Sequence, residues 1–372
     1  MRTEFDTLPS GVVVARTMGA TAGRAPGWSL EPVATIGSAE GADAFLFGRV
    51  AAVAVGIDNQ IHVLEAQARE VRVFDLNGKH VRTIGGPGGG PGELTFPVGM
   101  TVDPSGQVWV SDEGAGKYIV YAPDGSLTRE YRRPFPWVPL LRGGPRVSRD
   151  SSLLDFGQLG GRRVAVRMLV DSVLLPTDTI ILPAYDPPMF GRQLKSGERI
   201  GAFVPFGAQQ VTAIGPSGEI WTGVGASTYR LARLRGEGDT VRVIEMDVSR
   251  AALTSQERAT VDSAAAAAAG KGYAARPEDM PAYHPYFEDV VIDDRGNLWV
   301  RRADPGVRQK GSGSRPALFD IFAEDGAYTG TLAAPVEADP APSVGKGLLV
   351  GVRADSTGAP VVEVYRLLFT KR

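Results

Sequence analysis

Short polar turns followed by alternating apolar residues recur along this chain. The clearest copies begin at Asp58, Pro104, Pro216 and Asp294, and each leads into a segment such as Val-Trp-Val or Leu-Trp-Val. Alternation of this kind after a tight turn is typical of a β-hairpin. Hairpins repeated at intervals along one chain predict a repeat architecture made of β-sheets.

Six turn anchors set the number of sheets, and they are Asn59, Gly106, Ser152, Gly218, Gly296 and Gly347. The first two intervals between anchors each have room for four short strands. Third strands begin at the same offset from the first three anchors, at Val71, Tyr118 and Val164. The pattern predicts an all-β fold, a six-bladed β-propeller.

The sixth copy ends before its fourth strand is complete. Residues 30–37 resemble the fourth strand predicted at residues 81–85, so an N-terminal strand is expected to close the last blade. Closure of this kind removes open sheet edges. The predicted organisation is an N-terminal extension, residues 1–27, followed by one propeller domain, residues 28–372.

These residues carry a resemblance to a known superfamily. Residues 71–75, the turn at Gly78, residues 82–85 and the linker at residues 88–93 resemble NHL-type six-bladed β-propellers. The resemblance covers nearly the whole chain from about Trp28. It implies a fold shared with lactonases, amidating lyases, streptogramin lyases and many non-catalytic binding proteins, and it does not choose among them.

The predicted insertions fall on one face of the ring. This loop face carries the loops between second and third strands and the links between blades, and residues 183–206, 249–287 and 303–316 all belong to it. Long loops on one face of a rigid scaffold favour a binding site there. The alternative is that they only cover the channel mouth.

The insertion between the fourth and fifth blades predicts a helix. Thr254 and Glu257 form a capping box, six alanines follow, and Gly270 ends a helix expected over residues 254–269. Its smooth surface would suit a helical lid across the channel mouth. The alternative is a spacer helix on the rim.

Charge and composition restrict the partners. The net charge of −2 and the lack of cysteine argue against nucleic acid, disulfides and thiolate chemistry. Nine arginines between residues 129 and 167 form a local excess, which we interpret as a solvated outer surface. No apolar run suits a membrane span, and the first thirty residues show no signal peptide pattern. We predict a monomer in an extracytoplasmic location, periplasmic or secreted, and a cytosolic protein is the alternative.

Three residues at the end of the helical insertion are the candidate catalytic groups: His284, Glu288 and Asp289. A histidine beside carboxylates at a channel mouth could act as a general base or bind a metal. The alternative is a packed loop in which tyrosines and prolines anchor the helix. His62 and His80 are interpreted as structural.

Residues at the upstream ends of the innermost strands are expected to face the channel. Together with two tyrosines of the insertion, the candidate ligand-binding residues are Arg49, Met100, Arg146, Gln209, Gln210, Tyr283, Tyr286 and Lys346. Cations and amides suit a polar or anionic ligand. Only Glu288 and Asp289 could supply metal oxygens, so no cofactor is predicted, and a divalent cation in the channel is only an alternative.

Other chemistry lacks sequence support. The aspartates Asp75, Asp103, Asp112, Asp293 and Asp304 recur at turn positions, where capping explains them. The glycines of residues 85–92 are interpreted as a blade linker, since no Gly-Lys-Ser/Thr follows. Nucleophile-elbow and zinc-hydrolase motifs are absent from the sequence.

Three functions are compatible with this pattern. The first is a non-catalytic propeller that binds a polar small molecule, glycan or peptide at the loop face. The second is a hydrolase or lyase in the same pocket, with Arg49 or Arg146 holding an anionic group. The third is protein–protein interaction through a flat apolar face.

Overall fold

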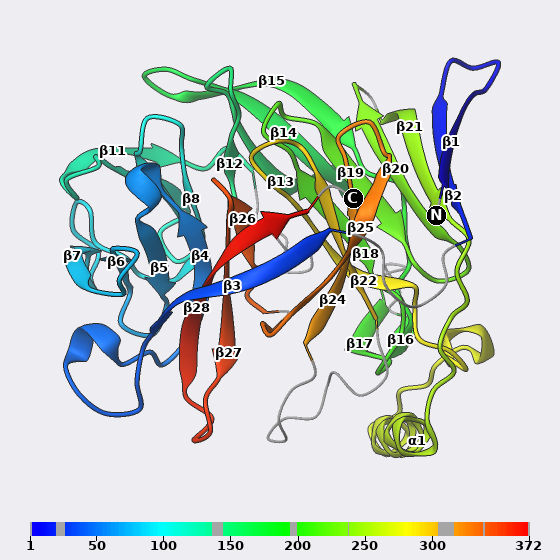
Figure 1. Cartoon of the computed structure of the whole chain (residues 1–372). Coiled ribbons are helices and arrows are strands. Elements are labelled where there is room, and N and C mark those ends of the chain that lie inside the picture. The colour runs from blue at the N-terminus through cyan, green and yellow to red at the C-terminus, as the bar shows by residue number, and fades with distance from the viewer. Residues whose placement is uncertain are drawn as a thin grey trace.

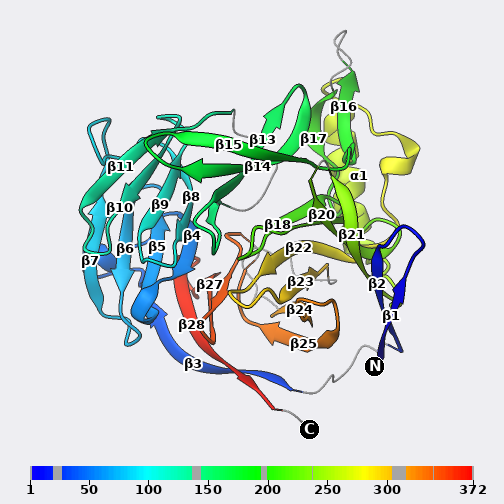
Figure 2. The ribbon, with the colours of Figure 1, turned by 90° about the horizontal axis from the view of Figure 1, so that it is seen from above.

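Six blades, each built on four strands, are arranged in a ring and make up the body of the molecule (Figures 1 and 2). The computed structural model describes residues 2–19, 27–135, 144–193, 199–236, 238–303, 316–337 and 339–370. Blade 1 comprises β4 (Val50–Val55), β5 (Ile61–Glu65), β6 (Glu70–Phe74) and β7 (His80–Gly85). Blade 2 comprises β8 (Pro97–Val102), β9 (Val108–Asp112), β10 (Lys117–Tyr121) and β11 (Leu127–Arg132). Blade 3 comprises β12 (Arg146–Val147), β13 (Leu153–Leu159), β14 (Arg162–Val170) and β15 (Leu174–Ile181).

The second half of the ring repeats this plan with insertions. Blade 4 contains β18 (Gln210–Ile214), β19 (Ile220–Val224), β20 (Tyr229–Arg235) and β21 (Asp239–Met246). Blade 5 contains β22 (Phe287–Ile292), β23 (Leu298–Arg302), β24 (Ala317–Phe322) and β25 (Tyr328–Ala334). Blade 6 contains β26 (Ser343–Gly345), β27 (Leu348–Ala354), β28 (Pro360–Phe369) and, from the start of the chain, β3 (Trp28–Ile36). The chain is therefore an all-β six-bladed propeller, as predicted.

The hydrophobic core is divided among the six interfaces between neighbouring blades. Each of six buried clusters combines apolar side chains from two adjacent blades. Between blades 6 and 1, for example, Val364 of β28 belongs to the same cluster as Val63 of β5, and both are fully buried. Because every blade buries both of its faces in this way, no blade can leave the ring without exposing two cores.

Strand β3 closes the ring, as the sequence predicts. It pairs antiparallel with β28 from Trp28 opposite Phe369 to Ile36 opposite Val362. The Trp28 ring lies 5.4 Å from the Trp299 ring of blade 5, and its indole N–H donates to the Thr329 hydroxyl at 3.3 Å. The beginning and the end of the chain are thus held in one sheet.

The residues before β3 add a feature that the sequence analysis treated as an extension. Strands β1 (Arg2–Thr7) and β2 (Val13–Met18) form a hairpin, and β2 pairs in parallel with β21. Blade 4 is therefore part of a six-stranded sheet. Val14 and Ala15 of β2 are buried there. Figure 2 shows the hairpin at the outer edge of blade 4.

The insertions lie on the loop face, which is at the bottom of Figure 1. Hairpin β16 (Met189–Gln193) and β17 (Arg199–Phe203) precedes blade 4, and helix α1 (Ser255–Ala269) follows it. Phe190 and Val204 pack with Val261 of α1 in a small core of their own. Both views place α1 at the periphery beside blade 4, not over the ring axis, which agrees with a rim helix. The predicted insertion at residues 303–316 lies almost entirely outside the described residues.

Three short 3-10 helices complete the described elements: η1 (Asp43–Phe45), η2 (Ile57–Asn59) and η3 (Pro277–Asp279). The helix prediction is confirmed, since the Thr254 hydroxyl accepts from the Glu257 N–H and the Glu257 carboxylate accepts from the Thr254 N–H at 2.8 Å.

Repeated carboxylates cap the turns. Asp103 accepts from the Ser105 and Gln107 amides and from the Trp109 indole N–H, and Asp293 binds its own turn and Trp299 in the same way. Asp75 binds its turn amides, and Asp112 binds those that precede β8. The capping interpretation is confirmed for these four, while Asp304 lies outside the described residues.

Candidate functional site

Two of the predicted ligand-binding residues reach the opposite end of the channel, at the face of tight hairpin turns. The Arg146 guanidinium extends from blade 3 to blade 5 and donates to the carbonyl of Ile292 at 3.0 Å. Lys346 lies in the turn after β26, not at the upstream end of that strand as predicted, and its ammonium donates to the Gly56 carbonyl at 2.7 Å. These cations tie blades together, because each one bonds to the backbone of another blade.

Four further candidates have separate structural surroundings. Arg49 is exposed, with its guanidinium 5.9 Å above the Phe96 ring. Met100 is buried in the core between blades 1 and 2, so it is not available to a ligand. Gln209 is half-buried, and Gln210 donates to the Pro183 carbonyl at 3.0 Å.

His284 is held by the helical insertion. Its ring is buried, lies 5.4 Å edge-to-face from Phe206, and has Nε2 3.2 Å from a Glu257 carboxylate oxygen. Glu257 is the capping-box residue of α1, so this contact joins the loop before blade 5 to the start of the helix. Such a position corresponds to the packed-loop alternative of the sequence analysis.

The neighbours of His284 also have structural partners. The Arg250 guanidinium lies between the rings of Tyr283 and Tyr286, at 5.0 and 5.6 Å. Glu288 forms an ion pair with Arg301 at 3.1 Å, and Asp289 accepts from the Val290 amide at 2.8 Å. The eleven predicted site residues therefore do not meet in one place, and none of them lines either groove described below.

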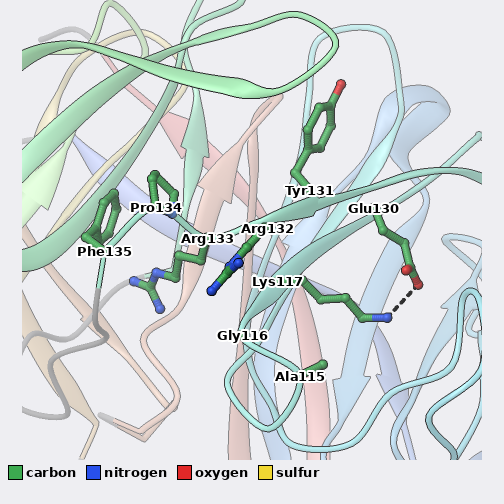
Figure 3. A pocket seen from close by; sticks show the side chains of 9 residues that line it. All are labelled: Ala115, Gly116, Lys117, Glu130, Tyr131, Arg132, Arg133, Pro134 and Phe135. Carbon is green, nitrogen blue, oxygen red and sulfur yellow. Dashed lines mark hydrogen bonds and ion pairs between the residues drawn. The ribbon is translucent and has the colours of Figure 1, made fainter.

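A groove of about 760 Å³ lies on blade 2, where the loop before β10 meets the end of β11 (Figure 3). It is lined by Ala115, Gly116, Lys117, Glu130, Tyr131, Arg132, Arg133, Pro134 and Phe135. Strand pairing places Lys117 opposite Arg132. The groove is open to solvent and brings three cations and one carboxylate together, which suits a polar ligand better than an apolar one.

Two of these cations are tethered. The Lys117 ammonium lies 2.7 Å from a Glu130 carboxylate oxygen, which also accepts from the Gly92 amide at 2.9 Å. Burial acts to raise the pKa of Glu130, but the hydrogen bond from Lys117 and then that from Gly92 outweigh it and lower the pKa. Glu130 is therefore held ionised, as an acceptor at the side of the groove.

Arg133 anchors the groove to blade 3. Its side chain is buried, donates to Glu113, and donates at 2.9 Å to both Asp155 and the Phe156 carbonyl. Its guanidinium also lies 5.0 Å from the Phe135 ring. Burial raises the pKa of Asp155 and of Glu113, and Arg133 opposes both shifts. The sequence interpretation of a solvated arginine surface is wrong at this position, because Arg133 is an interblade tie.

Arg132 differs from both neighbours. It is exposed, and within the described part of the chain its side chain takes part in no hydrogen bond or ion pair. Figure 3 shows its side chain between those of Lys117 and Arg133. The Arg132 guanidinium has free N–H donors and lies between two cations that are held in place by other contacts. This arrangement favours binding of an acidic group. The local excess of arginine was the signal for this groove in the sequence.

Two other features of the described residues bear on the predictions. No three His, Asp or Glu side chains gather there as a metal site would require, and the predicted lack of a cofactor stays a prediction. No helix among them is both long and apolar enough to cross a membrane.

Comparison with known proteins supports the fold. A family model described as a 6-bladed beta-propeller matches residues 38–142, which contain blades 1 and 2. A search of curated proteins found no match.

Several solved structures are similar in fold. A putative exported protein from Bacteroides fragilis is 13% identical, with a TM-score of 0.48 over 96% of this chain and 100% of its own. Virginiamycin B lyase from Staphylococcus aureus is 13% identical, with a TM-score of 0.45 over 92% and 100%. A gluconolactonase from Xanthomonas campestris is 13% identical, with a TM-score of 0.41 over 94% and 99%. The activities named for these proteins are their own.

Proposed function

The chain is a six-bladed β-propeller, and from that premise we propose that it is a binding protein for a polar ligand with an acidic group. The ligand binds in the groove of blade 2. The observation that carries the proposal is Arg132, an exposed cation whose side chain has no partner in the described residues and which lies between two tethered cations.

The groove can make several kinds of contact with such a ligand. Arg132 supplies a planar fork of donors that matches a carboxylate or phosphate. Glu130 accepts hydrogen bonds from hydroxyl groups, and Pro134 and Phe135 form an apolar end. A ligand that combines hydroxyls with an acidic group, such as a sugar acid, would use all of these groups.

The enzyme alternative has less support. Its candidate residues His284 and Glu288 have structural partners, Glu257 and Arg301, and lie on neither described groove. Binding without chemical conversion therefore needs fewer assumptions. We keep the extracytoplasmic location as part of the proposal, and cell fractionation with an antibody to the chain tests it.

Calorimetric titration with galacturonate tests the ligand class, with galactose as the uncharged counterpart. Galacturonate should bind the native protein and galactose should bind far more weakly. Arg132→Ala removes a charge-assisted contact, so its affinity for galacturonate should fall about tenfold or more. Arg132→Lys should lie between the two, because lysine keeps the charge but not the bidentate fork.

Arg295→Ala is the matched control. Arg295 is also an exposed arginine, in the turn between β22 and β23, away from the groove. Its substitution should leave the affinity unchanged. Equal binding of galactose and galacturonate, or an Arg132→Ala protein with native affinity, would contradict the proposal.

A further inference from the structure

Blade 3 carries a second groove at the position equivalent to that on blade 2. It has a volume of about 520 Å³ and is lined by Gly161, Arg162, Arg163, Ile181, Leu182, Pro183, Ala184, Tyr185 and Gly238. In both blades the lining comes from the start of the third strand and the end of the fourth. In both, the residue that follows the fourth strand donates its amide to the start of the third, from Arg133 to Gly116 and from Leu182 to Arg163, each at 3.0 Å.

The second groove is also cationic. Arg163 is half-buried and donates to the Tyr185 carbonyl at 3.1 Å, which fixes its side chain. Arg162 is exposed and its side chain, like that of Arg132, has no hydrogen bond or ion pair within the described residues. No acidic residue lines this groove. Each groove thus contains an arginine held by other contacts, Arg133 or Arg163, next to an arginine that is available to a ligand, Arg132 or Arg162.

The two grooves are close enough for one ligand. Arg133, in the wall of the first groove, donates to the Phe156 carbonyl of β13. Three residues further along β13, Leu159 pairs with Arg162 of the second groove. At about 3.3 Å per residue the two points are roughly 10 Å apart along this strand.

We propose that the two grooves form one track for an acidic oligosaccharide, in which Arg132 and Arg162 each bind one acidic group of the same chain. This inference rests on the proposed function and extends it from a single acidic group to a repeated one. The track runs from blade 2 to blade 3, across the ends of the outer strands. An extended peptide would bind along a free strand edge through its backbone, whereas sugar hydroxyls and carboxylates need only the side chains present here.

Oligogalacturonates of one to six units test the track, with methyl-esterified oligomers of equal length as uncharged controls. Affinity should rise at least tenfold from the monomer to the hexamer in the native protein, because the second groove adds an intramolecular contact. Arg162→Ala should abolish this gain in affinity with length. Arg132→Ala should weaken the monomer as well.

The outcomes separate the two proposals. Monomer binding that depends on Arg132 but does not increase with length would overturn the track and leave the proposed function standing. Absence of binding by every oligomer would overturn both. Equal affinity for esterified oligomers, or tighter binding of hexaglutamate than of the hexamer, would contradict an acidic glycan as the ligand. Arg295→Ala should retain the native length dependence.

Discussion

Individual residues in this protein repeat a role from blade to blade, and exceptions to the repeat are informative. Trp109 and Trp299 follow their turns and donate to the capping aspartates Asp103 and Asp293. Blade 1 places His62 where blades 2, 4 and 5 have tryptophan. His62 is buried, and burial, followed by the charge of Arg82, lowers its pKa to about 4. The folded protein therefore keeps this imidazole neutral.

This shift predicts a pH-dependent loss of stability. The pKa in the folded state lies below the 6.5 of the unfolded chain, so the stabilising contribution is complete above about pH 6.5 and is lost as pH falls toward 4. Acidification from about pH 7.5 to about pH 5 should lower the free energy of unfolding by about 2 kcal/mol through the protonation of His62.

Urea titrations of the native protein and His62→Gln at both pH values measure the contribution. The substituted protein should lose less stability on acidification than the native one by about this amount. A parallel loss in both proteins would show that His62 does not titrate in this range.

At the scale of elements, the blades and the helical insertion are separately stabilised. Helix α1 buries Val261 and Ala268 against the β16–β17 hairpin, in a core distinct from the six interblade clusters. Glu257 connects this unit to blade 5 through His284. Elements with small cores of their own open at lower free energy than the rest of the fold.

Glu257→Ala should therefore loosen the helix without unfolding the blades. The variant loses the capping box and the His284 contact, which should cost the helix about 1–2 kcal/mol. Hydrogen exchange should accelerate over residues 255–269 and stay unchanged in blades 1 and 2.

Asp262→Ala is the comparison, since Asp262 is an exposed carboxylate of the same helix. It should not accelerate exchange. If Glu257→Ala also lowered galacturonate affinity, the insertion and the blade-2 groove would be coupled. That result would contradict the separate stabilisation of the insertion and the blades.

At the scale of the whole molecule, stability depends on strand β3, which pairs with β28 and closes the ring. Ile36 of β3 is fully buried in the core shared by blades 6 and 1, and β3 is the only strand that completes the last blade within the described residues. The β1–β2 hairpin adds only to the outer edge of blade 4. The two N-terminal elements therefore have unequal importance.

Ile36→Ala should lower the unfolding free energy by about 2–5 kcal/mol, because it leaves a cavity at the closure. Deletion of residues 1–19 should lower it less and preserve one cooperative transition. Chemical denaturation followed by tryptophan fluorescence measures both. A larger loss on deleting the hairpin would show that blade 4, not blade 6, limits the ring.

The repeat, the blade number, the closing strand and the capped helix could all be predicted from sequence. Each depends on local turn chemistry, strand alternation or capping residues such as Thr254 and Glu257, and these act over a few residues. The addition of the β1–β2 hairpin to blade 4 was missed because β2 pairs in parallel with β21, more than 200 residues away, and such pairing leaves no local signal.

The site required tertiary structure. Sequence position alone suggested that Arg146 and Lys346 face one channel mouth. The Arg146 side chain instead reaches a backbone carbonyl at the other end, and Lys346 lies in the turn after β26 at that end, where it also binds a backbone carbonyl. The arginine excess was visible, but only packing separates Arg133, buried between two carboxylates, from Arg132, which stays exposed. Sequence by itself determined the scaffold, because local preferences repeat in every blade. Tertiary structure decided which charges are neutralised, because that depends on contacts between blades.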